Sequence, residues 1–97
     1  MAPRVSISVE AENDIERIAA FTTATWGWRQ TDKYLVRLED GFALMASNPS
    51  IGRPCDAIRQ GLRRFEIGRH VVFYLSEPKG VLVVRVLHEE MLPTQYL

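Results

Sequence analysis

The sequence predicts an α+β domain in which a helical hairpin packs on one face of a mainly antiparallel sheet, in the order β-α-α-β-β-β. Two helical patterns follow each other in the first half, separated only by Gly27. Three runs rich in β-branched and aromatic residues follow between Leu62 and His88. With 97 residues, we expect residues 1–97 to form a single domain whose core needs no disulfide or metal.

The first expected elements are a short strand and a helix. Val5 and Ile7 alternate with polar residues in Arg4–Ile7, which is typical of a half-buried strand. Ser8 is a suitable helix N-cap, because its hydroxyl can accept a hydrogen bond from a free amide of the first turn. Gly27 is expected to end this helix, since glycine tolerates the left-handed conformation found there.

A stripe of residues at three- and four-residue spacing marks the buried side of the first helix. Its members are Ile15, Ile18, Ala19, Thr22 and Trp26. The same rhythm predicts a second helix from about Trp28 to Ser47, antiparallel to the first. Trp26 and Trp28 flank the turn, and we expect them to close the core between the two helices.

The second half predicts a loop and a three-stranded meander. The loop is expected from Pro49 to about Gln60, because a proline disfavours helix in the residue before it. The expected strands are Leu62–Ile67, His70–Ser76 and Val81–His88. Gly68 and Arg69 form the two-residue turn of the first hairpin, and "EPKG" forms the second turn.

Composition argues against several function classes. Lys and Arg together number 12, as do Asp and Glu, so no overall charge favours nucleic acid or a membrane. Cys55 is the only cysteine, which excludes an intramolecular disulfide and argues against a Cys-based zinc site. Motifs for phosphate, metal or Ser-His-Asp chemistry are absent, so we expect no cofactor and no metal. The chain has neither a signal peptide nor an apolar run of about 20 residues, which favours a cytoplasmic protein.

Cations are interspersed among the apolar residues of the predicted strands. Alternation along the last strand predicts one face with Leu82, Val84, Val86 and His88, and another with Val83, Arg85 and Leu87. Arg85 should then point away from His88, so the two should not form a catalytic pair. Arg85 has two open interpretations: it binds a partner, or it pairs with a carboxylate of the helices or the tail. His70, which follows a turn, is expected to be an ordinary strand residue.

Ordered motifs along most of the chain give a family resemblance. They are "SVEAENDIERI", "TWG", "NPSIGRP", "LRRFEIGRHVVFY" and "VRVLHEEM". Together they resemble the RelE/ParE superfamily of small bacterial toxins, and the ParE branch most of all. The resemblance implies a RelE/ParE-like fold and the toxin component of a type II toxin-antitoxin system. It also implies neutralisation by a ParD-like antitoxin and binding of DNA gyrase as target, with no catalytic residue.

The resemblance directs attention to seven candidate residues for binding the antitoxin or the target. They are Arg63, Arg64, Arg69, Arg85, His88, Met91 and Tyr96. The antitoxin is expected either to lay a helix in a groove beside the helical hairpin or to add a strand to the sheet edge. Contact with DNA is expected only through the antitoxin or gyrase. The tail Leu92–Leu97 either packs on the sheet or stays free for a partner.

One departure from the ParE pattern leaves two alternatives open. Glu90 stands where typical ParE sequences have an arginine before the methionine, here Met91, which puts the target and the potency in question. The chain could be a degenerate toxin that only binds its antitoxin. The other alternative is a ribosome-dependent mRNA endonuclease of the RelE type, in which Arg85, His88 and Tyr96 should matter most. The acidic pair Glu89-Glu90 opposes this, since it would repel an RNA backbone.

Overall fold

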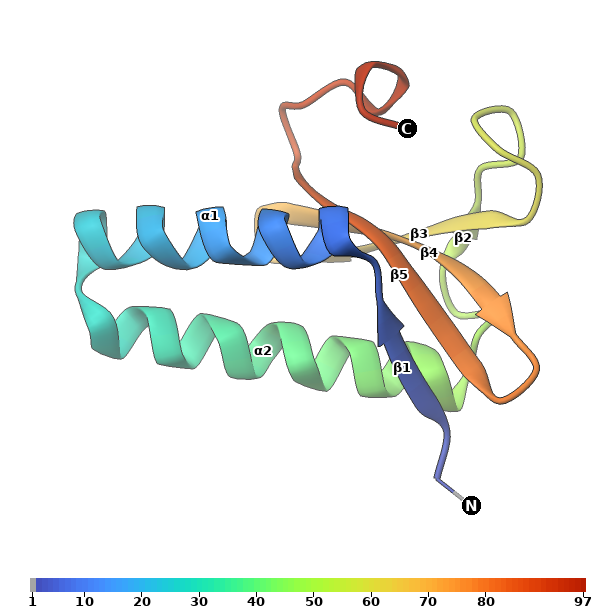
Figure 1. Ribbon diagram of the computed structural model, residues 1–97, viewed down its shortest axis with the longest axis horizontal. Coiled ribbons are helices and arrows are strands. Elements are labelled where there is room, and N and C mark those ends of the chain that lie inside the picture. Colours follow the sequence, from blue (N-terminus) through green and yellow to red (C-terminus); the bar gives the residue numbers. More distant parts are fainter. Residues whose placement is uncertain (1) are drawn as a thin grey trace.

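The predicted α+β architecture is confirmed by the computed structural model, which describes residues 2–97 (Figure 1). The elements are β1 (Arg4–Ile7), α1 (Val9–Trp26), α2 (Trp28–Ser47), β2 (Arg53–Pro54), β3 (Leu62–Ile67), β4 (His70–Glu77), β5 (Gly80–His88) and the 3-10 turn η1 (Pro93–Gln95). The sheet order is β1-β5-β4-β3-β2, with β1 parallel to β5 and the other pairs antiparallel. The helical hairpin separates β1 from the meander and packs on one face of the sheet (Figure 1).

The helix boundaries follow the predicted capping residues. Ser8 Oγ accepts a hydrogen bond from the Ala11 amide at 3.0 Å and donates one to the Val84 carbonyl at 2.7 Å. The N-cap of α1 is therefore also fixed to β5. Gly27 separates the helices with φ of 90°, a conformation that strongly favours glycine. This geometry lets the chain reverse direction between α1 and α2 within a single residue.

Gly80 is required for the parallel edge of the sheet. It is the register partner of Arg4 at the start of the β1–β5 pairing. A Cβ atom at this position would overlap the backbone of Arg4, including its carbonyl oxygen. The β4–β5 turn therefore needs glycine here for β1 to join the sheet.

Apolar side chains are buried on both faces of the sheet. The helix-side core, beneath α1 and α2, contains Ala11, Ile18, Leu38, Phe42, Met45, Ala46, Ile67, Val72, Tyr74, Val81, Val83 and Val86. The open-face cluster, on the other side, contains Leu62, Val71, Phe73 and Leu87. The loop residues Cys55 and Ile58 and the tail residues Met91 and Leu97 pack against the open-face cluster.

A bulge in β5 makes the predicted two-face assignment of this strand wrong. Phe73 is paired with Arg85 but Tyr74 with Val83, so Val84 is an extra residue on β5. As a result, Val83 belongs to the helix-side core together with Val86, and Val84 packs against the open-face cluster. A strict period of two cannot reveal a bulge, because nothing in the apolar pattern marks the extra residue.

Two further expectations are wrong. Trp26 and Trp28 do not close the core but are 72% and 63% exposed. The turn between the helices projects beyond the sheet, so no strand lies beneath it to bury these rings (Figure 1).

The expected loop from Pro49 to Gln60 contains the strand β2. A strand of two residues is too short to show periodicity, and it exists through its pairing with β3.

Candidate functional site

A groove with a volume of about 520 Å³ lies between α1, the first half of α2, the β3–β4 turn and the end of β5. It is lined by Asp14, Arg17, Ile18, Phe21, Thr22, Trp26, Gln30, Tyr34, Arg37, Gly68, Arg69, His70, Val86, His88 and Met91. The volume is in the range of pockets that hold small molecules or side chains of a partner. The candidate site is therefore on the helical side of the sheet, where the two helices overhang it.

One wall of the groove is apolar and accessible. Phe21 and Trp26, on consecutive turns of α1, are 69% and 72% exposed. Ile18 and Met91 continue the apolar lining. Large aromatic side chains grouped at the surface of a groove are typical of a protein-binding site, because their burial by a partner is favourable.

The other part of the groove is polar and includes both histidines. His70 Nδ1 lies 2.5 Å from Tyr34 Oη, and the Tyr34 hydroxyl donates a hydrogen bond to the Ile67 carbonyl at 3.0 Å. The rings of His70 and His88 meet edge to face with centroids 5.4 Å apart. Burial lowers the pKa of His70 below its usual 6.5, as does the neighbouring His88, and burial raises the pKa of Tyr34.

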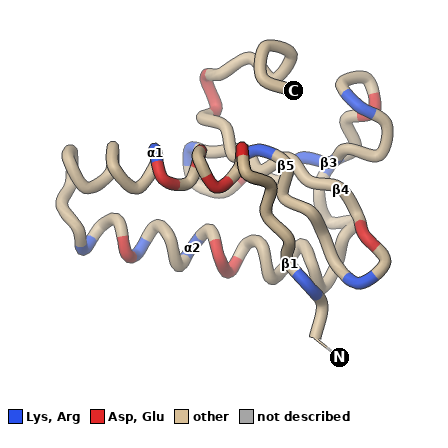
Figure 2. The backbone as a smooth tube through the Cα atoms, viewed as in Figure 1, with Lys and Arg blue, Asp and Glu red and all other residues tan. Residues whose placement is uncertain are grey.

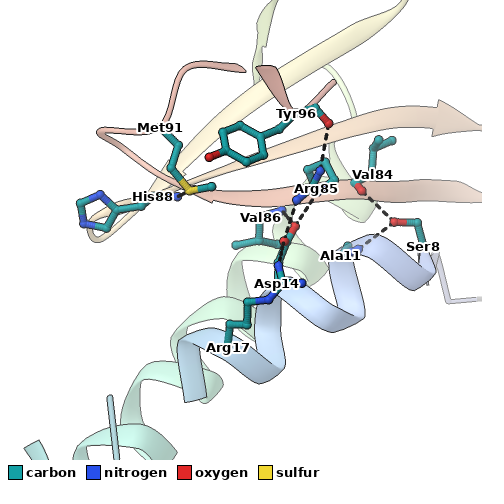
Figure 3. Close-up of polar contacts among 10 residues, drawn as sticks. All are labelled: Ser8, Ala11, Asp14, Arg17, Val84, Arg85, Val86, His88, Met91 and Tyr96. Carbon is teal, nitrogen blue, oxygen red and sulfur yellow. Dashed lines mark hydrogen bonds and ion pairs between the residues drawn. The ribbon is translucent and has the colours of Figure 1, made fainter. Parts of the chain in front are cut away.

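Arg85 lies outside this polar cluster and pairs with α1 (Figure 3). Its Nε and one terminal nitrogen donate to the two carboxylate oxygens of Asp14 at 2.8 and 2.9 Å. The Val86 amide also donates to Asp14, at 2.9 Å, and the second terminal nitrogen of Arg85 donates to the Tyr96 carbonyl at 2.9 Å. The hydrogen bonds to Asp14 raise the pKa of Arg85. Arg85 therefore has the structural pairing that was one of its two predicted interpretations.

The sequence is similar to a known protein family. The family model for the ParE toxin of the type II toxin-antitoxin system, parDE, matches residues 5–93. The chain belongs to the ParE toxin family. Toxin ParE1 of Mycobacterium tuberculosis is 40% identical over 92 residues, which cover 94% of each chain. Toxin ParE1 of Caulobacter vibrioides is 34% identical over 85 residues, 88% of each chain. The molecule is thus the toxin of a type II toxin-antitoxin system.

The fold of the ParE-family toxin is also similar to a solved structure. A chain from the structure titled "Chromosomal ParDE TA system from P. aeruginosa" superposes with a TM-score of 0.75 over 90% of this chain and 96% of that chain. The sequence identity is 14%, so this similarity concerns the fold. The RelE/ParE-like fold expected from the motifs is therefore confirmed.

The tail of the ParE-family toxin packs on the open face of the sheet. Met91 and Leu97 contact the open-face cluster, and the Met91 sulfur accepts the His88 amide at 3.3 Å. The Arg85 guanidinium stacks on the Tyr96 ring, 5.6 Å from its centroid (Figure 3). Of the two expected states of the tail, the structure has the packed one.

The predicted arginines do not converge on one site. Arg63 donates to the Gly52 carbonyl at 2.6 Å on one side of β3, and Arg64 lies over the Phe73 ring, 5.6 Å from its centroid. Arg69 pairs with Glu89 at 3.4 Å. Figure 2 shows Lys and Arg distributed over both helices, the strands and the loops. Arg63 and Arg64 are register partners of Tyr74 and Phe73, which lie on opposite faces of the sheet, so these arginines do not form one site.

Several residues of the groove were not among the sequence candidates. Phe21, Tyr34 and Arg37 come from the helices, and the exposure of a helical aromatic residue has no clear signal in sequence. Asp14 did have a signal, because it precedes Ile18 by four residues and so lies on the buried side of α1. A carboxylate at that position requires a buried cation, and Arg85 among valines was the available one.

Residues 2–97 contain neither a metal-binding cluster nor a helix able to span a membrane. Within this range, no group of three or more His, Cys, Asp or Glu is placed to hold a metal ion. No helix of the described chain has the length and apolar character to cross a membrane.

Proposed function

We propose that this ParE-family toxin is neutralised by a cognate ParD-like antitoxin that binds in the groove, and that the free toxin binds and inhibits DNA gyrase. The observation that carries the proposal is the 520 Å³ groove with Phe21 and Trp26 exposed along it. The toxin acts in this proposal by occupying a protein surface and not by breaking a bond.

The antitoxin enters the groove as an amphipathic helix. Phe21 and Trp26 both line the groove and are exposed, which suits apolar residues at the i, i+3, i+4 and i+7 positions of a partner helix. The other expected mode, strand addition, would use one of the two sheet edges, β1 or β2. These strands are only four and two residues long, so each provides few backbone hydrogen bonds. The groove therefore supports the helical mode better.

The target-binding surface includes the tail, in our proposal. Leu92 and Tyr96 are exposed on it, with Tyr96 at 41%, and the position of the segment is fixed through Arg85. Arg64 lies on the same sheet face as Arg85, since both are register partners of Phe73. In this proposal gyrase binds at these residues, on a surface that adjoins the antitoxin groove at His88 and Met91. Of the remaining arginines, Arg69 at the rim of the groove contacts the antitoxin in this proposal. Arg63 has a structural role, because it donates a hydrogen bond to the Gly52 carbonyl.

One observation favours the alternative of an mRNA endonuclease. His70, His88 and Tyr34 form a cluster of groups able to transfer protons, with Arg37 and Arg69 in the same groove. Against it, the Arg85 guanidinium is engaged by Asp14 and by Tyr96, the residue that the alternative also requires. Alanine at His88 separates the two functions: a gyrase inhibitor keeps its toxicity, whereas an endonuclease with this cluster loses it while remaining folded.

The proposed function is tested with purified toxin, freed of antitoxin, on gyrase and plasmid DNA. Supercoiling and cleaved DNA are followed as toxin is titrated. We expect dose-dependent inhibition or cleavage that stoichiometric antitoxin reverses. No effect at large excess of folded toxin would refute gyrase as the target. Ribosomes with mRNA, assayed in parallel, would then show whether the alternative holds.

A further inference from the structure

Both histidines of the chain lie together at one end of the antitoxin groove. His70 on β4 and His88 at the end of β5 are register partners, and their rings are 5.4 Å apart. At this separation His88 disfavours the charged form of His70. The pKa of His70 therefore depends on the charge of a group that binds beside it in the groove.

The tautomers follow from which group the Tyr34 hydroxyl and the Glu90 amide bond. With the Tyr34 hydroxyl donating to the Ile67 carbonyl, the short contact to His70 is made with the proton on Nδ1 of the histidine. Nε2 of His70 is then unprotonated. At His88 the Glu90 amide donates to Nδ1 at 3.2 Å, so the proton of this ring is on Nε2. An additional proton on His70 Nε2 then costs no hydrogen bond.

The charges around the pair favour an anion in the groove. Arg17 on α1, Arg37 on α2 and Arg69 in the β3–β4 turn line it. Asp14 is the only carboxylate among the lining residues of the described chain. The three hydrogen bonds from Arg85 and Val86 engage both of its oxygens.

A second carboxylate lies near the histidines without lining the groove. Glu89 interacts with His70 and opposes the lowering of its pKa, although more weakly than burial and His88 lower it. Its carboxylate is paired with Arg69 at 3.4 Å. Arg17 likewise lies 3.6 Å from Asp14, so of the three lining arginines Arg37 alone has no ion pair within residues 2–97, and its counter-ion would come from a partner.

We propose that the His70–His88 end of the groove is a carboxylate subsite, which takes one acidic side chain of the bound antitoxin and couples antitoxin binding to proton uptake by His70. The inference rests on the proposed function, because it places the antitoxin in this groove. It goes further by naming the chemical group that binds at one end of the groove, and it predicts that neutralisation depends on pH.

The direction of the pH dependence follows from the two states of His70. In the free toxin, burial and His88 hold the pKa of His70 below 6.5. A carboxylate at Nε2 stabilises the imidazolium and raises this pKa in the complex. The complex then binds more protons than its free components, so affinity increases as the pH falls from the raised pKa of His70 in the complex toward its lower pKa in the free toxin. An apolar group at the same place would lower the pKa further and reverse the sign.

Isothermal titration of toxin with its antitoxin measures this linkage. Titrations at about pH 6 and about pH 8, in buffers of different ionisation enthalpy, give both the Kd and the protons taken up. We expect a Kd about fivefold to tenfold lower at the acidic pH and uptake of most of one proton. His70→Gln removes the proton uptake and the pH dependence. Phe21→Ala is the matched control: it weakens binding by the same factor at both pH values and leaves the uptake unchanged.

A second measurement needs no variant of His70. The two imidazole C2 protons are followed by NMR in the free wild-type toxin and in its complex, and the pKa of His70 should rise on binding. An unchanged or lowered pKa of His70, or proton release in the titrations, overturns the proposal even if the antitoxin binds tightly. In that case, tight binding would still support neutralisation by the antitoxin. If toxin and antitoxin form no complex, both the proposed neutralisation and the carboxylate subsite are refuted. A rise caused by a single-stranded RNA oligonucleotide but not by the antitoxin would assign the subsite to nucleic acid and also overturn the proposal.

Discussion

The two faces of the sheet are covered in different ways. On one face, two helices of 18 and 20 residues bury a core of twelve residues. On the other face, four buried residues are covered by part of a loop and by the C-terminal tail. Burial of apolar area is the dominant source of stability, so the helix-side core must supply most of it. The open face can then carry a segment with exposed side chains, such as Leu92 and Tyr96.

A single buried pair connects the two faces at the edge of β5. Beyond Ile7, β1 no longer pairs with β5, and side chains of α1 take over the backbone groups of that edge. Ser8 bonds the Val84 carbonyl and Asp14 bonds the Val86 amide (Figure 3). Arg85 then joins Asp14 to the tail carbonyl of Tyr96. Replacing Asp14 therefore tests how strongly the two faces of the sheet depend on each other.

Asp14→Ala should have the largest effect on stability. It leaves the Arg85 guanidinium and the Val86 amide without their acceptor, and breaking a buried pair in this way costs about 3–5 kcal/mol. Chemical denaturation measures the free energy of unfolding. Arg17→Ala is the control, since Arg17 approaches Asp14 only at 3.6 Å with a side chain that is 74% exposed, and it should cost less than about 1 kcal/mol. Similar losses for both variants would contradict the assigned role of Asp14.

Tyr74→Phe should have an intermediate effect and tests how the helix-side core holds the loop after α2. The buried hydroxyl accepts the Gly52 amide and donates to the Pro49 carbonyl, both at 2.8 Å. Its loss leaves buried groups unpaired, which costs about 1–3 kcal/mol. Tyr96→Phe, which removes a hydroxyl from a partly exposed ring on the tail, should change the free energy of unfolding by less than about 0.5 kcal/mol. Equal effects would mean that the loop is not held by Tyr74.

Deletion of Tyr96 and Leu97 should lower the free energy of unfolding less than Asp14→Ala does, but it should abolish gyrase inhibition. It removes the stacking on Arg85, its hydrogen bond to the tail and the contact of Leu97 with the open-face cluster, together about 1–2 kcal/mol. The truncated toxin should remain folded by circular dichroism while losing gyrase inhibition. Full inhibition by the truncated chain would remove the tail from the target-binding surface.

The smallest expected effect is the pH dependence contributed by His70. Its pKa is below 6.5 in the folded toxin, so the unfolded chain binds more protons as the pH falls below about 6.5. The contribution of His70 to stability is therefore present above that pH and is lost as the pH falls toward the folded pKa. His70→Gln should flatten the stability curve in this window. A curve with unchanged slope would show that His70 is not buried enough to resist protonation.

Most of the fold was predictable because its signals are local. Ser8 and Gly27 mark the ends of α1 by their own chemistry, and glycines with β-rich runs mark the hairpins. The bulge at Val84 and the strand β2 were not predictable, since both depend on a partner strand distant in sequence. The wrong expectation for Trp26 has the same origin. Its helical spacing was correct, but the sequence of the helix does not show how far the sheet extends beneath it.

The candidate site was predicted in part. His88, Met91 and Arg69 do line the groove, and the structural role of Arg85 was one of its two interpretations. The polar cluster was missed because Tyr34 and His70 are 36 residues apart and meet only through the packing of α2 on the meander. Alternation along each strand separates faces, but it does not say which helix residue lies opposite.

The central claim is that the groove binds the antitoxin while the tail acts on the target. The most direct test is a gyrase supercoiling assay on two variants, each with and without antitoxin. We predict that Phe21→Ala with Trp26→Ala inhibits gyrase like the wild type but is no longer rescued by antitoxin. The chain without Tyr96 and Leu97 should fail to inhibit but still bind antitoxin. Loss of both properties in either folded variant would contradict the separation of the two surfaces.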